Sequence, residues 1–85
     1  MIVTYADEFK KQFIRLPQRV QDAYHVQEDI LKTNVFDTRL HAKPLKNYEG
    51  MFSFRVTRAY RVLFRISDHT IVICLTISHR KDAYR

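Results

Sequence analysis

The first part of the chain shows the apolar spacing of two consecutive helices. Phe9, Phe13 and Leu16 recur at helical spacing between charged residues, which predicts an amphipathic helix with one buried stripe. Pro17 ends this helix and suits the first turn of the next one. A second apolar stripe over residues 20–31 predicts a longer helix, so we expect a helical hairpin behind a short β-prone start.

The second half of the chain changes to a period of two, which marks strands with one buried face. Apolar and polar residues alternate over residues 52–56 and 60–66, and a further β-rich run covers residues 71–77. Short turns separate the three runs and predict an antiparallel sheet. The expected fold is α+β in the order β-α-α-β-β-β: an N-terminal strand, a two-helix hairpin and a C-terminal antiparallel sheet, with the helices packed on one face.

The turn lengths predict which residues lie opposite each other in this sheet. A three-residue loop over residues 57–59 sets Arg55 opposite Arg61, and a four-residue turn sets Ile66 opposite Ile71. This register places one set on the face away from the helices: Arg55, Arg61, Arg65, Cys74, Thr76 and Ser78. Facing arginines repel unless an anion lies between them, so we expect an arginine-lined surface suited to phosphate. The alternative is that their side chains splay into water.

The net charge of +6 comes from 15 Lys and Arg against nine Asp and Glu, and it is unevenly distributed. Residues 1–42 carry as many basic as acidic groups, so the whole surplus lies in residues 43–85. Such a surplus predicts a positive face, with nucleic acid, an acidic protein and a merely basic surface as the alternatives. On the second helix, the acidic Glu28 and Asp29 are expected to face solvent.

The composition argues against several classes of protein. Cys74 is the only cysteine, so we expect neither an internal disulfide nor a thiolate metal site. No HExxH or CxxC pattern occurs, and a single glycine excludes a glycine-rich phosphate loop. The longest uninterrupted apolar run, residues 71–75, is far too short to span a bilayer. We therefore expect a cytoplasmic, single-domain protein that uses no metal or other cofactor and contacts no membrane.

The last eight residues combine side chains that suit RNA chemistry. The segment that starts at Ser78 contains His79, Arg80, Lys81, Tyr84 and Arg85. Imidazole exchanges protons near neutral pH, cations neutralise phosphate, and an aromatic ring stacks on a base. A charged C-terminal segment that is merely solvated is the alternative.

Four segments together resemble a known family. These are residues 41–46 (HAKPLK), 52–56 (FSFRV), 60–66 (YRVLFRI) and 79–85 (HRKDAYR). The pattern resembles the RelE/ParE superfamily of toxins from toxin–antitoxin pairs, most closely the RelE branch. The resemblance implies a single RelE-like toxin domain over residues 1–85 that acts as a metal-independent, ribosome-dependent endoribonuclease. Its implied partners are a cognate antitoxin and mRNA on the ribosome, with 16S rRNA contacts.

The resemblance also implies roles for individual residues. Arg55 falls where the family carries a basic catalytic residue, and Arg61 matches the arginine of its Tyr-Arg motif. Arg80 and Tyr84 match the basic and aromatic residues of its C-terminal motif, so Tyr84 is expected to stack on a base or orient the phosphate.

The implied reaction is attack by a ribose 2′-OH on the adjacent phosphorus. The two matched arginines would stabilise the phosphorane, and His79 or Arg80 would protonate the leaving oxygen. Glu49 and Lys46 are the candidates for the base. Further RNA contacts are expected from Lys43, Lys46, Arg58, Arg65, Lys81 and Arg85.

Two other functions stay open at this point. One is a ParE-like toxin that inhibits a topoisomerase by protein contact and has no nuclease activity. The other is a degenerate homologue that still binds antitoxin. Convergence of the Arg61 and Tyr84 side chains on one pocket would favour the nuclease.

Overall fold

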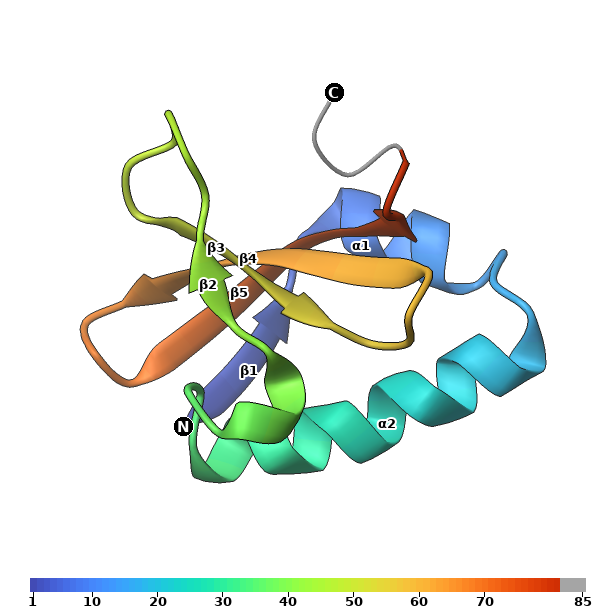
Figure 1. Ribbon diagram of the computed structural model, residues 1–85, viewed down its shortest axis with the longest axis horizontal. Coiled ribbons are helices and arrows are strands. Elements are labelled where there is room, and N and C mark those ends of the chain that lie inside the picture. The colour runs from blue at the N-terminus through green and yellow to red at the C-terminus, as the bar shows by residue number, and fades with distance from the viewer. Residues whose placement is uncertain (82–85) are drawn as a thin grey trace.

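The structure, a computed structural model, describes residues 1–81 and has the expected α+β class and element order (Figure 1). The strands are β1 (Ile2–Tyr5), β2 (Lys43–Pro44), β3 (Met51–Arg55), β4 (Tyr60–Ser67) and β5 (Ile71–His79). The helices are α1 (Asp7–Phe13) and α2 (Gln18–Thr33), followed by a short 3-10 turn, η1 (Thr38–Leu40). The sequence pattern does not predict β2, which is only two residues long.

The two helices form in the predicted regions, but α1 ends at Phe13, before Leu16 and Pro17, and Pro17 precedes the first residue of α2. Phe9 of α1 is buried, and Phe13 and Leu16 pack against the core. Pro17 precedes α2 with an extended backbone (φ −54°, ψ 146°), which separates the two helices. In the described part of the chain, neither helix combines the length and the apolar composition needed to cross a membrane.

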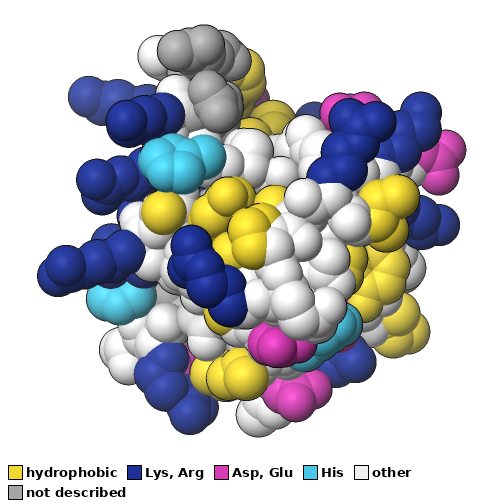
Figure 2. All heavy atoms as spheres, turned by 90° about the vertical axis from the view of Figure 1, so that its right-hand side faces the viewer, with side chains coloured by type: hydrophobic (Ala, Val, Ile, Leu, Met, Phe, Trp, Pro, Cys, Tyr) yellow, Lys and Arg dark blue, Asp and Glu magenta, His cyan; other side chains and the backbone are white. Residues whose placement is uncertain are grey.

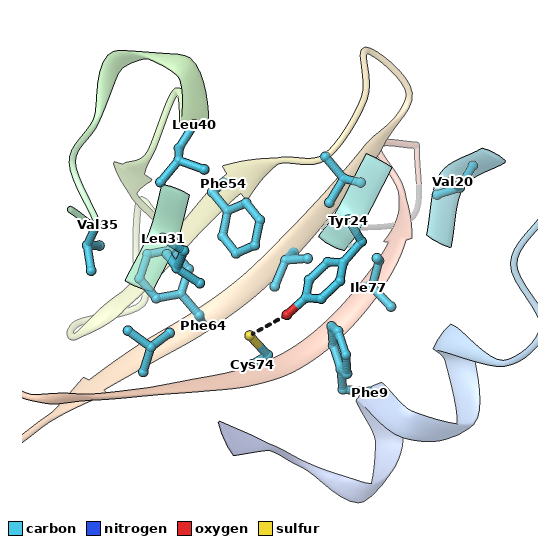
Figure 3. Close-up of a cluster of buried hydrophobic side chains, with 13 residues drawn as sticks. Phe9, Val20, Tyr24, Leu31, Val35, Leu40, Phe54, Phe64, Cys74 and Ile77 are labelled. Atoms are coloured by element: carbon cyan, nitrogen blue, oxygen red, sulfur yellow. Dashed lines mark hydrogen bonds between the residues drawn. The ribbon is translucent and has the colours of Figure 1, made fainter. Parts of the chain in front are cut away.

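The strands form one sheet in the order β1-β5-β4-β3-β2. β1 pairs with β5 in parallel, and the other neighbours are antiparallel. Figure 1 shows α2 along one side of the sheet, and in Figure 3 Phe54 and Phe64 of the sheet point towards Tyr24 and Leu31 of α2. The core therefore lies on this helix-covered face, and we call the opposite side the open face.

The pairing of β3 with β4 is as predicted, whereas the start of β5 is shifted by one residue. Arg55 lies directly opposite Arg61. Ser67, rather than Ile66, lies opposite Ile71. The connecting turn is one residue shorter than expected, because two of its residues adopt left-handed backbone conformations (φ 52° and 62°) that reverse the chain tightly.

The shift exchanges the two faces of the first half of β5. Val72 and Cys74 are fully buried, so the placement of Cys74 on the open face is wrong. A β-bulge then leaves Leu75 as an extra residue in the pairing of β4 with β5. Beyond the bulge the original alternation returns: Ile77 is buried, and Ser78 lies on the open face as predicted.

A buried carboxylate joins α2 to the sheet on the helix-covered face. Glu28, expected at the surface, is buried, and its Oε1 accepts hydrogen bonds from the hydroxyls of Tyr5 and, at 2.9 Å, Tyr24. Lys32 Nζ lies 3.7 Å from Glu28 Oε2. The Tyr24 hydroxyl also lies 3.6 Å from Cys74 Sγ (Figure 3). Burial raises the pKa of the Cys74 thiol to about 12 and holds the pKa of both tyrosines above their usual value.

Candidate functional site

The open face carries a row of polar side chains at the end of the sheet where β4 begins. Arg61 lies opposite Arg55 of β3 and opposite Ser78 of β5. Residues directly opposite share a face, and the neighbouring Val62 and Phe54 are buried towards the helices. We call Arg55, Arg61 and Ser78 the arginine row, because two guanidinium groups in adjacent strands concentrate positive charge there.

The β3–β4 loop fixes the guanidinium of Arg61. Its Nη1 donates hydrogen bonds to the carbonyl oxygens of Thr57 at 2.8 Å, Arg58 at 2.9 Å and Tyr60 at 3.2 Å. The Thr57 hydroxyl accepts hydrogen bonds from the backbone N–H groups of Ala59 at 3.1 Å and Tyr60 at 3.2 Å. The cation is thus held by carbonyl groups that are themselves fixed, which is the preorganisation that electrostatic stabilisation of a transition state requires.

Arg55 combines a fixed backbone with an unpaired side-chain donor. Gln27 of α2 donates from Nε2 to the Arg55 carbonyl oxygen at 2.8 Å and to that of Arg39 at 3.1 Å. Within residues 1–81, the Nε of Arg55 is a buried side-chain nitrogen with no hydrogen-bond partner. A buried donor without an acceptor is unfavourable, so the position of Arg55 is not explained by its contribution to stability.

Further cations extend the positive charge along the open face. Arg65 lies opposite Met51, Lys43 lies opposite Ser53, and both basic residues are exposed. Strands β3, β4 and β5 contain no Asp or Glu. Figure 2 shows Lys and Arg side chains projecting in a row along one side of the molecule, with histidine side chains beside them. Such a surface attracts polyanions and raises their association rate.

The end of β5 gathers more basic residues beside the β3–β4 loop. A groove of about 510 Å³ is lined by Arg58, Ala59, His79, Arg80 and Lys81. The Arg80 backbone N–H donates to the Ala59 carbonyl at 2.6 Å, which joins this segment to the loop that holds Arg61. The Lys81 backbone N–H donates to His79 Nδ1 at 3.2 Å, which fixes the end of β5 beside the groove.

His79 does not share a face with the arginine row. It lies opposite Tyr60, with the ring centroids 5.6 Å apart and the rings at 71°. Tyr60 packs against the core on the helix-covered face. His79 therefore reaches a phosphate at the arginine row only around the end of the sheet.

The candidate bases stand apart from the arginine row. Glu49 and Lys46 are exposed in the loop between β2 and β3. Met51, the first residue after this loop, is four residues from Arg55, which corresponds to about 13 Å along a strand. The structure therefore does not place the backbones of these two residues beside the arginine row. Tyr84 and Arg85 lie outside the described residues, so the expected convergence of Tyr84 with Arg61 stays a prediction.

Two residues that position the arginine row are missing from the candidates chosen by sequence. Gln27 anchors the backbone of Arg55, and Thr57 organises the loop that holds Arg61. The sequence contains a feature that could have identified each of these two residues. Gln27 is a polar residue within the apolar stripe of α2, and Thr57 opens a short turn, where a hydroxyl commonly accepts backbone hydrogen bonds.

Comparisons with known sequences relate the chain to toxins. A family model described as the ParE toxin of the type II toxin–antitoxin system parDE matches residues 3–84. Toxin RelG of Mycobacterium tuberculosis is 49% identical to the chain over 45 residues. That match spans 51% of this chain and 51% of RelG, about half the length of each.

Solved structures of toxins share the fold. A chain of the RelBE2 toxin–antitoxin complex from M. tuberculosis is 33% identical, with a TM-score of 0.68 over 93% of this chain and 96% of that one. A YoeB/ParE toxin from Agrobacterium tumefaciens is 18% identical, with a TM-score of 0.80 over 94% of this chain and 99% of that one. At 18% identity, the similarity to the A. tumefaciens toxin shows a shared fold only.

Proposed function

This chain belongs to the ParE toxin family of type II toxin–antitoxin systems, within the RelE/ParE superfamily, and from that premise we propose that it is an endoribonuclease toxin. Its proposed substrate is messenger RNA on the ribosome, where basic residues of the open face also contact 16S rRNA. The proposed reaction uses the side chains of the protein and requires neither a metal nor another cofactor.

The arginine row is the observation that carries this proposal. Arg55 and Arg61 face each other across two strands, and the Nε of Arg55 is buried with no hydrogen-bond partner among the described residues. A guanidinium group matches the oxygens of a phosphate and stays charged at every relevant pH. A phosphodiester bound between the two arginines relieves their mutual repulsion.

In the proposed reaction the 2′-oxygen of a ribose attacks the adjacent phosphorus. A base removes the 2′ proton, the new phosphorus–oxygen bond closes a 2′,3′-cyclic phosphate, and the bond to the 5′-oxygen breaks. Arg55 and Arg61 stabilise the negative charge that accumulates on the phosphorane. His79 or Arg80 protonates the leaving 5′-oxygen. The arginine row itself supplies no base, because Glu49 and Lys46, the candidates by sequence, lie beyond Met51 in the β2–β3 loop.

The proposal also includes a cognate antitoxin that neutralises the protein. Several of the solved relatives are toxin–antitoxin complexes, among them RelBE2 of M. tuberculosis. An acidic or amphipathic segment of the antitoxin would cover the basic open face or the helical hairpin, because the charge surplus of residues 43–85 attracts such a segment.

The direct test adds the purified protein to ribosomes translating a defined message and maps the new ends. We expect internal cuts with 5′-hydroxyl and 2′,3′-cyclic phosphate ends. Replacing Arg61 by Ala should lower the cleavage rate by roughly 10²- to 10³-fold, the loss typical of removing one donor to a developing oxyanion. Arg61→Lys should recover part of the loss, since it keeps the charge but loses the planar fork. Arg19→Ala, at an exposed site on α2, is the matched control and should leave the rate unchanged.

A second function, inhibition of a topoisomerase without nuclease activity, is favoured by the family model, whose description names the ParE toxin. A supercoiling assay with a bacterial topoisomerase distinguishes the two. Inhibition of supercoiling without new RNA ends would replace the nuclease proposal. A protein that binds antitoxin but is inactive in both assays would be a nontoxic homologue.

A further inference from the structure

Strand β2 and the loop that follows it combine an exposed aromatic ring with two lysines. Tyr48 is 55% exposed, whereas Tyr24 is buried and Tyr60 packs against the core. Lys43 and Lys46 are exposed on either side of Leu45, which is partly buried. We propose that this basic-aromatic loop, Lys43, Lys46 and Tyr48, binds a nucleotide of single-stranded RNA: its base stacks on Tyr48 and its phosphate contacts the lysines. The inference rests on the proposed nuclease function and adds a second RNA-binding site to it.

The loop is shaped as a binding surface. An open groove of about 540 Å³ is lined by β2 and the first part of the loop: Lys43, Pro44, Leu45, Lys46, Asn47 and Tyr48. Exposed aromatic rings beside cations are the usual arrangement for single-stranded nucleic acid, because every base has a face that stacks and every phosphate carries charge.

Backbone hydrogen bonds and two special conformations fix the shape of this loop. The Leu45 N–H donates to the Met51 carbonyl at 2.9 Å, and the Met51 N–H donates to the Tyr48 carbonyl at 3.1 Å. Asn47 and Gly50 adopt left-handed backbone conformations (φ 67° and 77°), which glycine and asparagine tolerate best. A loop held in this way loses little conformational freedom when it binds a nucleotide.

The open face connects the loop with the arginine row. Arg65 lies opposite Met51, the residue that follows the loop, and Arg61 lies four residues along the same strand, at about 13 Å. In Figure 1 the loop rises from the sheet on the side away from α2. An extended RNA strand bound at the arginine row therefore passes Arg65 and reaches Tyr48, so that the loop holds a nucleotide distant from the cleaved bond.

The test measures binding separately from cleavage. A short, fluorescently labelled 2′-O-methyl RNA, which lacks the attacking hydroxyl, is titrated with the full-length protein. Tyr48→Ala should raise the Kd about tenfold, equivalent to about 1.4 kcal/mol, within the usual range for base stacking. Tyr48→Phe should bind like the wild type, because its ring still stacks. Lys46→Gln should weaken binding and reduce its salt dependence, whereas Lys11→Gln on α1 is the matched control.

Abasic oligonucleotides complete the test. If the ring stacks on a base, an oligonucleotide with that base removed should bind the wild type and Tyr48→Ala equally. Equal Kd values for wild type and Tyr48→Ala with the complete oligonucleotide would overturn the inference, as would absence of binding by the wild type. Dependence on Tyr48 without cleavage on ribosomes would keep the loop as an RNA site and reject the nuclease. Weaker antitoxin binding by Tyr48→Ala with unchanged RNA binding would instead mark the loop as a protein interface.

Discussion

Glu28 on the helix-covered face and Arg55 on the open face differ in whether their buried polar atoms have hydrogen-bond partners. On the helix-covered face, the carboxylate of Glu28 accepts hydrogen bonds from Tyr5 and Tyr24, so its burial is compensated inside the protein. On the open face, the Nε of Arg55 is buried without a partner in residues 1–81, directly beside the strand that carries Arg61.

This difference separates what stabilises the protein from what the protein is built to bind. A satisfied buried network supports the fold, since each member would be costly to leave unpaired. An unsatisfied buried donor adds nothing to stability, and two arginines opposite each other attract an anion from outside. Substitutions on the helix-covered face should therefore change stability, and substitutions on the open face should change activity.

The largest expected effect is a loss of stability caused by a substitution on the helix-covered face. Phe54→Ala removes a fully buried ring and should lower the free energy of unfolding by about 3–5 kcal/mol. The matched control is Leu63→Ala on the adjacent strand, a partly exposed residue between the buried Val62 and Phe64. Leu63→Ala should lower the free energy of unfolding, measured by urea denaturation, clearly less than Phe54→Ala does. Equal losses for both variants would remove the distinction between the faces.

High pH should also lower the stability of the protein, through groups buried on the helix-covered face. The pKa of Cys74 is 9.0 without the fold and about 12 within it, because burial favours the neutral thiol. The contribution of the neutral Cys74 thiol to the free energy of unfolding is therefore complete below pH 9. It is lost as the pH rises towards 12, by about 1.4 kcal/mol per pH unit. Tyr5 and Tyr24, whose pKa values are also raised, should steepen the fall above pH 10.

Urea midpoints measured at several pH values from 8 to about 11 check this dependence. The matched variant is Cys74→Ala, whose stability should fall less steeply with pH because it has no thiol to ionise in the unfolded state. Identical slopes for the variant and the wild type would show that Cys74 does not contribute.

A smaller effect is expected at Thr57, which acts through Arg61. Thr57→Val keeps the shape but removes the hydroxyl that accepts two backbone hydrogen bonds, at a cost of about 1 kcal/mol in stability. Cleavage should fall several-fold more than for Thr70→Val, an exposed threonine in the β4–β5 turn. If the rate stays at the wild-type level while stability falls, the loop does not position Arg61.

The sequence predicts this fold well where neighbours in the chain pair with each other. The three-residue loop between β3 and β4 is enough to set Arg55 opposite Arg61. The predicted register at the start of β5 is wrong by one residue, because residues 71–75 are all apolar and suit either face, and a tight turn and a β-bulge set the pairing. The parallel pairing of β1 with β5 joins the two ends of the chain, and no local pattern encodes it.

The site is less predictable than the fold, because its geometry depends on contacts between distant residues. Glu28 looks like a surface residue of α2, yet hydroxyl groups of Tyr5 and Tyr24 make its burial tolerable. Gln27 reaches the Arg55 backbone from a different element. His79 follows Ser78 of the open face, so the alternation along β5 places it on the face opposite to the arginine row. Residue types identify these groups as candidates, but only the fold determines which of them meet.

The most direct test of the central claim is a double-variant cycle on the arginine row. Single-turnover cleavage of a message on saturating ribosomes is measured for Arg55→Ala, Arg61→Ala and the double variant. If the two arginines hold one phosphate, each single variant should lose roughly 10²- to 10³-fold in rate, and the double variant only slightly more. Losses that simply multiply in the double variant, or single variants that cleave at the wild-type rate, would contradict a shared phosphate site between Arg55 and Arg61.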